Sequence, residues 1–217
     1  MKVIVTGATG MVGEGVLIEC LNNKEVESVL YVGRKSSGKS HPKLTEYLIS
    51  DFLLLKNDDS NLAGYDACFY CAGISSVGMD EAQYTHITYD TTMHFAKVLL
   101  SQNENLTFNF ISGLHTDSTE KGKVMWARVK GKTENALQTL PFKGQYNFRP
   151  GLMKPDASQV HIKGYNKYLK FLYPIMGLFY TGCKTTEIGH AMINVVKSGF
   201  PIKILEAKDI KKAAELK

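Results

Sequence analysis

A glycine-rich turn near the amino terminus carries the clearest chemical signal in the sequence. Residues 6–13 read TGATGMVG and stand between a short apolar segment and a segment of helical periodicity. One glycine of such a turn permits the tight bend, a second lets a phosphate approach the backbone, and a third lets helix and strand pack closely. We expect Gly7, Gly10 and Gly13 to take these roles in that order, with the helix N–H groups facing the anion. The turn predicts a site for the pyrophosphate of a dinucleotide, made of Gly7, Ala8, Thr9, Gly10, Met11, Val12 and Gly13.

Two cations stand where many dinucleotide sites have an acid. Arg34 and Lys35 follow the apolar segment 29–32, at the place where an Asp or Glu would bond the ribose hydroxyls of NAD. A guanidinium suits a 2′-phosphate, so the pair favours NADP over NAD. The alternative is a solvated Arg-Lys pair without a ligand. We also expect Asp51 and Phe52, at the end of a third strand, to flank the adenine.

The elements that must position these residues alternate between apolar strands and helices. Strands are expected at 3–5, 29–32, 44–49, 67–71, 106–111, 146–148 and 202–205, and helices at 12–21, 85–100, 124–140 and 185–196. Repeated strand–helix–strand units predict an α/β fold, a doubly wound and mostly parallel Rossmann sheet of six to seven strands. Ligands of such sheets bind at the carboxyl ends of the strands. We expect one domain, 1–217, in which 151–200 form a small lobe over that edge.

Composition excludes several classes of function. The net charge is +5, and the Lys and Arg residues are scattered instead of forming a stripe, so nucleic-acid binding is not expected. The apolar stretch 168–180 is too short to span a bilayer, and reads as a lid or packing segment. A strand that begins at residue 2 leaves no room for a signal peptide, which predicts a cytoplasmic protein.

The cysteines are expected to be packing residues and not metal ligands. Cys68 and Cys71 form a CxxC pair, but a zinc site would need a second pair at matching spacing, and the sequence has none. The surrounding run ACFYCA reads better as a buried strand than as a redox motif. His86 and His94 have no carboxylate partner at metal spacing, so no metal ion is expected.

Taken together, these motifs resemble the atypical short-chain dehydrogenase/reductase family. The resemblance is carried by TGATGMVG, by Gly33-Arg34, by Asp51-Phe52 and by the strand end Cys71-Ala72-Gly73, and it continues through 149–151 and 185–189. The chain looks most similar to the branch of nucleoside-diphosphate-sugar epimerases that includes the Tat-interacting-protein oxidoreductases. The resemblance implies a Rossmann fold, an NAD(P) cofactor that also contacts Cys71, Ala72 and Gly73, and subunits that can pair as homodimers.

The family's usual catalytic residues are a serine and a Tyr-x-x-x-Lys pair, and here one of them is replaced. By resemblance, Ser112 matches the serine and Lys130 the lysine, which would also bind the nicotinamide ribose, but Trp126 stands in the place of the tyrosine. Indole offers an N–H donor and no titratable oxygen, so Trp126 cannot transfer the tyrosine's proton. Trp126 then has either a packing role within the protein or a stacking role against the cofactor or the substrate. His115, in the loop beyond Ser112, titrates in the right range to donate the proton instead.

Three functions remain open from the sequence. The first is an NADP(H)-dependent reductase or epimerase-like enzyme acting on a small carbonyl or sugar-nucleotide substrate. The second, suggested by Trp126, is a non-catalytic NADP(H)-sensing regulatory or binding protein. The third is an isomerase or dehydratase that uses bound cofactor without net redox. Several apolar side chains follow Pro150, and they either line a substrate pocket or take part in ordinary packing. They are Met153, Tyr165, Tyr168 and Phe179.

Overall fold

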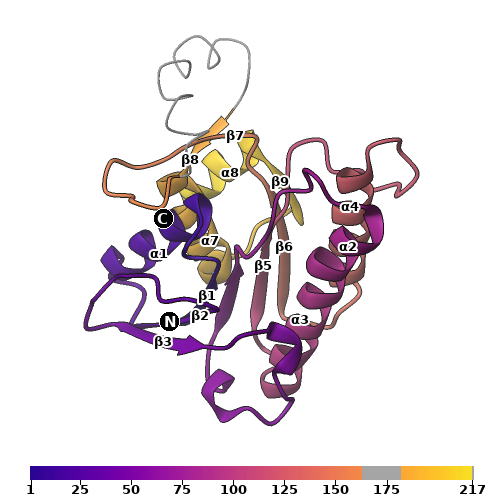
Figure 1. The fold of residues 1–217 in the computed structure, drawn as a ribbon. Coiled ribbons are helices and arrows are strands. Elements are labelled where there is room, and N and C mark those ends of the chain that lie inside the picture. Colours follow the sequence, from indigo (N-terminus) through magenta and orange to yellow (C-terminus); the bar gives the residue numbers. More distant parts are fainter. Residues whose placement is uncertain (163–181, 217) are drawn as a thin grey trace.

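A computed structural model of the chain describes residues 1–162 and 182–216. Its central sheet has seven strands in the order β3-β2-β1-β4-β5-β6-β9, all paired in parallel (Figure 1). The strands are β1 (Lys2–Thr6), β2 (Ser28–Gly33), β3 (Leu44–Leu48), β4 (Ala67–Tyr70), β5 (Thr107–Ile111), β6 (Gly144–Arg149) and β9 (Ile204–Glu206). This confirms the α/β class and the parallel sheet. The strand order reverses between β1 and β4, which is where doubly wound folds bind their ligands.

Helices cover both faces of the sheet (Figure 1). On one face lie α1 (Met11–Asn22), α7 (Thr185–Ser198) and α8 (Ala207–Ala214). On the other lie α2 (Glu81–Thr85), the π-helical turn η3 (His86–Asp90), α3 (Thr91–Gln102) and α4 (Met125–Gln138). Because side chains of a strand alternate between faces, Val3 and Val5 pack under α1 while Ile4 packs under α3. A parallel sheet buried on both faces needs this continuous apolar run.

Aromatic side chains fill the core on the α3 face. The ring of Tyr70 lies 5.8 Å from that of Phe108 and 5.5 Å from that of Phe95, measured between centroids. Phe52, in the short 3-10 helix η1 (Phe52–Leu54), joins them, with its ring 5.0 Å from Phe95. A second 3-10 helix, η2 (Ser60–Leu62), precedes β4. These rings form one aromatic cluster between the sheet and α3.

The helix expected at 85–100 begins earlier than the sequence indicated. Asp80 caps α2, since its side chain accepts a hydrogen bond from Gln83 N at 2.8 Å, and helical structure runs from there through η3 into α3. The helix α8 was also not expected. It is short, buries Ile210 and Ala213, and begins with reciprocal hydrogen bonds between Glu206 and Asp209.

The chain after Pro150 takes part in two sheets. β7 (Leu152–Lys154) pairs in parallel with β8 (Gly182–Lys184), and β9 then adds a strand to the central sheet beside β6. Met153 lies on β7, whereas Tyr165, Tyr168 and Phe179 and the stretch 168–180 lie outside the described residues. The small lobe at 151–200 therefore stays a prediction. In the described part of the chain, no helix is long and apolar enough to cross a membrane.

Candidate active site

The glycine-rich turn joins β1 to α1 at the carboxyl edge of the sheet. Gly7 has a left-handed φ of +72°, and a methyl group at this position would lie 2.5 Å from the carbonyl oxygen of Cys71. A methyl group at Gly13 would collide with the Gly7 carbonyl. Both glycines are therefore required by the protein's own packing.

Gly10 differs from the other two glycines of the turn. The nearest atom to a methyl group at Gly10 would be the Gly7 carbonyl oxygen, at an ordinary contact distance of 3.4 Å. Gly10 is also the N-cap of α1, and no side chain caps the helix there. The first-turn N–H groups of α1 have no intrahelical acceptors, and the helix dipole favours an anion beside them. Of the remaining turn residues, Ala8 is buried, Thr9 is exposed, and Met11 and Val12 are partly exposed.

Thr6 holds the end of β4 against the glycine-rich turn. Its hydroxyl oxygen accepts hydrogen bonds from Cys71 N at 3.1 Å and from Ala72 N at 3.0 Å. A methyl group at Gly73, one residue further, would meet no atom of residues 1–162 or 182–216 within 4 Å. The strand end 71–73 thus borders the turn, as expected, and leaves open space beside it. Thr6 was not among the predicted site residues, although its position directly before Gly7 was a signal.

Tyr31 links the glycine-rich turn to the loop that carries the two cations. The hydroxyl donates to Lys35 O at 3.0 Å and shares a hydrogen bond with the Thr9 side chain. A methyl group at Gly33 would collide with this hydroxyl, which explains the glycine at the end of β2. Burial raises the pKa of Tyr31. The side chains of Arg34 and Lys35 are exposed, at the edge where the expected 2′-phosphate would lie.

A carboxylate near this loop comes from the neighbouring strand and was not foreseen. Glu46 of β3 accepts a hydrogen bond from Ser37 N at 2.8 Å and another from the Ser37 hydroxyl. Burial alone would raise the pKa of Glu46, but the hydrogen bonds from Ser37 and Ser36 lower it. The carboxylate is therefore ionised and used to shape the loop.

Asp51 and Phe52 have separate roles in the structure. Asp51 is exposed, and its side chain accepts a hydrogen bond from Leu53 N at 3.0 Å at the start of η1. Phe52 is 8% exposed, with its ring in the aromatic core. The ring is not free to stack on a ligand, so only Asp51 and the Phe52 backbone could face an adenine. Contact with the adenine stays a prediction.

A strap of residues 156–161 lies along the amino-terminal half of α1. The fully buried carboxylate of Glu14 accepts hydrogen bonds from Val160 N at 2.9 Å, from His161 N at 2.7 Å and from Lys39 Nζ at 2.9 Å. Burial would raise the pKa of Glu14, but these hydrogen bonds outweigh it and lower the pKa. The Gln159 amide nitrogen donates to Met11 O, and its amide oxygen accepts a hydrogen bond from the Thr185 hydroxyl. None of these contacts was expected from the sequence; a glutamate among apolar helix residues was the signal.

Ser112 lies at the carboxyl end of β5, as predicted. Its N–H donates to Phe148 O at 2.8 Å, and its Oγ lies 2.9 Å from Oγ1 of Thr116. Thr116 in turn donates to Gly113 O at 2.8 Å. Because the Thr116 proton is used in that bond, the Ser112 hydroxyl is the donor to Thr116. The Ser112 lone pairs then remain for a ligand.

Trp126 and Lys130 come from one face of α4 to the same strand end. A methyl group at Gly113 would lie 3.4 Å from Trp126 Cζ3 and 4.0 Å from Lys130 Cδ. The Lys130 ammonium donates to Ile111 O at 3.2 Å. Burial lowers the pKa of Lys130 to about 8, and the charge of Glu134 opposes this only in part. The structure thus brings Ser112, Trp126 and Lys130 together.

His115 lies in the loop beyond Ser112, with a left-handed φ of 65° and an exposed side chain. Its catalytic role stays a prediction. Asp117, next along this loop, accepts hydrogen bonds from Gly122 N and from Thr119, which lower its pKa. A methyl group at Gly131 of α4 would collide with the Asp117 carbonyl, so the loop packs directly on the helix backbone.

A buried ion pair fixes this loop from the other side. The Arg149 guanidinium, at the end of β6, forms a bidentate pair with the fully buried Glu134 of α4. It also donates to Ser118 Oγ at 2.7 Å and to Glu206 at 3.3 Å. The loop after β5, the helix α4 and the ends of β6 and β9 are therefore joined through one side chain.

The cysteines do not form a reactive site. Cys68 packs on the α3 face and Cys71 against the α1 face, and burial raises the thiol pKa of both. Over residues 1–162 and 182–216, no group of three or more His, Cys, Asp or Glu side chains is arranged to hold a metal ion.

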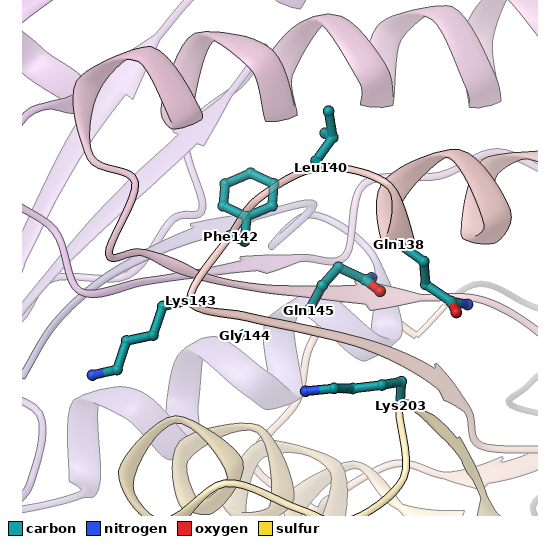
Figure 2. A pocket seen from close by; sticks show the side chains of 7 residues that line it. All are labelled: Gln138, Leu140, Phe142, Lys143, Gly144, Gln145 and Lys203. Atoms are coloured by element: carbon teal, nitrogen blue, oxygen red, sulfur yellow. The ribbon is translucent and has the colours of Figure 1, made fainter.

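A shallow hollow of about 160 Å³ lies away from these residues. Figure 2 shows its lining residues, which come from the end of α4, from the loop between α4 and β6, from the start of β6 and from the segment before β9: Gln138, Leu140, Phe142, Lys143, Gly144, Gln145 and Lys203. Gly144 and Gln145 begin β6, so the hollow is at the amino edge of the sheet. The candidate site is at the opposite, carboxyl edge.

Comparison with known proteins agrees with this geometry. The model of the NAD dependent epimerase/dehydratase family matches residues 3–114, which run from β1 through the glycine-rich turn to Ser112. Trp126 and Lys130 lie beyond the matched part.

Solved structures share the fold at low sequence identity. The Bordetella bronchiseptica enzyme WbmF in complex with NAD+ is 15% identical, with a TM-score of 0.68 over 98% of this chain and 76% of that one. A short-chain dehydrogenase/reductase from Saccharomyces cerevisiae is 14% identical, with a TM-score of 0.66 over 96% of each chain. A UDP-N-acetylglucosamine 4-epimerase from Methanobrevibacter ruminantium is 17% identical, with a TM-score of 0.67 over 94% and 75%. These matches confirm the resemblance expected from the motifs, and the chain belongs to the NAD-dependent epimerase/dehydratase family.

Proposed function

We propose that the chain binds NADP(H) along the carboxyl ends of β2, β1, β4 and β5 and acts as an oxidoreductase or epimerase on a small carbonyl or sugar-nucleotide substrate. The observation that carries the proposal is the environment of Gly10. Among the described residues no atom requires a glycine there, yet the residue caps α1 where a pyrophosphate would lie. Gly73 is open in the same way. The residues present thus fit a dinucleotide.

The order of the strands gives each residue a place along such a ligand. Arg34 and Lys35 follow β2 and would hold the 2′-phosphate, the turn after β1 would hold the pyrophosphate, and the end of β4 would border the nicotinamide ribose. Lys130, on the helix after β5, would hold the oxygen of a carbonyl substrate, and the Ser112 oxygen at the end of β5 would accept a hydrogen bond from the ligand. A bound nicotinamide supplies the hydride chemistry. The complex of WbmF, a protein of the same fold, with NAD+ supports a nicotinamide dinucleotide as the ligand.

The cofactor is tested by titrating the protein with NADPH and NADH while following the fluorescence of Trp126. Loss of a charge-assisted hydrogen bond costs about 1.5–3 kcal/mol, so Arg34→Ala should raise the Kd for NADPH by roughly 10- to 150-fold. The Kd for NADH should change little. Lys143→Ala removes an exposed cation at the opposite edge of the sheet and should change neither. Equal weakening of both cofactors by Arg34→Ala would rule out recognition of the 2′-phosphate.

A second candidate function, an NADP(H)-sensing binding protein, is favoured by one observation. Trp126, which by resemblance stands in the place of the family's tyrosine, lies against Gly113 beside Lys130 and brings no titratable group there. NADPH binding without oxidation of NADPH by any of a broad panel of carbonyl compounds would support the sensor. Turnover that Lys130→Ala abolishes would exclude it.

A further inference from the structure

We propose that Lys130 is the group that gives the proton to the substrate oxygen, in place of the tyrosine whose position Trp126 occupies. The inference rests on the proposed function and names the acid of that same site. Three polar side chains meet at the end of β5, and two of them cannot do this work. Trp126 has no titratable proton, and the Ser112 hydroxyl donates to Thr116 at 2.9 Å.

The Lys130 ammonium keeps donors available for a ligand. Its Nζ donates to Ile111 O at 3.2 Å and lies 5.3 Å from the centre of the Phe110 ring. An ammonium has three N–H groups, and these contacts use one of them in a hydrogen bond. The side chain is partly exposed, and its stem lies 4.0 Å from a methyl group at Gly113. A carbonyl oxygen beside Ser112 is therefore within reach.

The usual carboxylate partner of such a lysine is occupied. Glu134 lies one helical turn beyond Lys130, where it could pair with the ammonium. Both of its oxygens instead bind the Arg149 guanidinium. In the described part of the chain, no carboxylate forms a hydrogen bond or ion pair with the Lys130 ammonium.

The other charged groups on the elements packed against α4 are also turned elsewhere. Glu81 forms an ion pair with Arg128, and Asp90 pairs with His86. Asp117 accepts hydrogen bonds from Thr119 and Gly122, and the Lys132 ammonium lies over the ring of Tyr89. The side chains of Lys97 and His115 are exposed. Burial is thus the largest influence on the pKa of Lys130, with Glu134 acting against it, and the pKa falls to about 8. An acid of this strength is mostly protonated at neutral pH and can still release its proton.

The reductive step then balances without another acid. A reduced nicotinamide supplies a hydride, which carries its electron pair to the carbonyl carbon. The π pair of the carbonyl moves to oxygen, and the oxygen takes one proton from the Lys130 ammonium. The products are the alcohol, the oxidised cofactor and a neutral Lys130 amine, which regains a proton from water.

The first test needs no substrate. Acetylation of Lys130 by acetic anhydride, followed by mass spectrometry across a pH series, measures the fraction of free amine. We expect a midpoint near pH 8. A midpoint above about pH 10, the ordinary range for lysine, would overturn the proposal.

The second test uses a substitution that keeps the charge. Lys130→Arg preserves a cation with hydrogen-bond donors, but arginine does not release a proton near neutral pH. We expect the variant to bind NADPH and to lose kcat by about 100-fold or more, the usual contribution of a positioned acid. Lys132→Arg, on the exposed side of the same helix, is the matched control and should retain kcat. In the wild type, kcat should fall as pH rises through about 8.

The outcomes separate this proposal from the proposed function. A wild type that binds no NADPH, or that binds it and turns over no carbonyl, refutes the oxidoreductase and its acid together. If the wild type reduces a carbonyl compound and the Lys130→Arg variant is equally active, only the proton-donor role of Lys130 is refuted. If Lys130→Arg fails to fold, the wild-type pH profile decides, because a kcat that is constant from pH 7 to pH 9.5 contradicts it.

Discussion

Replacing Gly10 and Gly13 by alanine, one at a time, should separate the part of the glycine-rich turn that serves the fold from the part that serves a ligand. A methyl group at Gly13 collides with the backbone of Gly7, which cannot yield as a flexible side chain can. Overpacking of this kind costs about 1–3 kcal/mol or more. For a chain of this size, about 3 kcal/mol corresponds to a Tm roughly 6–12 °C lower.

Gly10→Ala should leave stability nearly unchanged. Gly10 has φ −115° and ψ 161°, which alanine adopts freely, and the new methyl group would have 3.4 Å of clearance. Alanine is a poorer N-cap than glycine by about 0.5 kcal/mol, but it lowers the entropy of the unfolded chain by a similar amount. The methyl group would nevertheless stand where a pyrophosphate approaches. Loss of one charge-assisted hydrogen bond, about 1.5 kcal/mol, would already raise the Kd for NADPH about tenfold.

Thermal unfolding followed by circular dichroism and calorimetric titration with NADPH measure the two effects on the same samples. The reasoning predicts a folded Gly10→Ala variant with weak binding and a destabilised Gly13→Ala variant. An unchanged NADPH affinity in Gly10→Ala would show that the open space at this glycine does not serve the cofactor. An unchanged Tm in Gly13→Ala would refute the packing argument.

Three further predictions concern contacts around the site. Glu134→Gln leaves Arg149 without its bidentate partner and should cost about 3–5 kcal/mol in urea unfolding, and a cost below about 1 kcal/mol would contradict the buried pair. The lowered pKa of Glu14 means that its stabilising effect is present above the unfolded pKa of about 4.3 and is lost as pH falls through the folded value. The protection of the 156–161 amides, measured relative to their intrinsic exchange rates at each pH, should therefore fall in acid, and in Glu14→Gln it should already be low at pH 7. Tyr31→Phe should cost about 1 kcal/mol and weaken NADPH binding more than NADH binding; an equal effect on both cofactors would exclude a role in placing the 2′-phosphate loop.

The features that the sequence predicted well are those set by neighbouring residues. The strands and the glycine-rich turn follow from apolar runs and from three glycines at fixed spacing, and the parallel order follows from the repeated strand–helix units. The start of the helix at Asp80 was not predicted, because the residues before Thr85 are mostly polar and show no helical spacing of apolar side chains. Asp80 itself is a good N-cap residue.

Contacts between distant residues could not be read from one sequence. Phe52 was expected beside an adenine, but its ring belongs to a core built from β4 and α3. Glu46 lies on β3, the strand beside the loop that carries Arg34 and Lys35. Its distance in sequence from the glycine-rich turn therefore does not identify it as a residue of the site. The hydrogen bond of Tyr31 to Lys35 requires a fold before it can be seen. The roles predicted for Ser112 and Lys130 came from the family resemblance.

The strap over α1 has a consequence for how the protein acquires its fold during synthesis. Glu14 bonds to Val160 across 146 residues, and Gln159 bonds to Met11 across 148. Such long-range contacts raise the contact order and form late, after the entropy of closing a long loop has been overcome. While the chain emerges from the ribosome, the Glu14 carboxylate must stay hydrated until Val160 has been made. A nascent chain arrested after β6 should therefore hold an immature amino-terminal helix, and pausing at that point would expose it to proteases and chaperones.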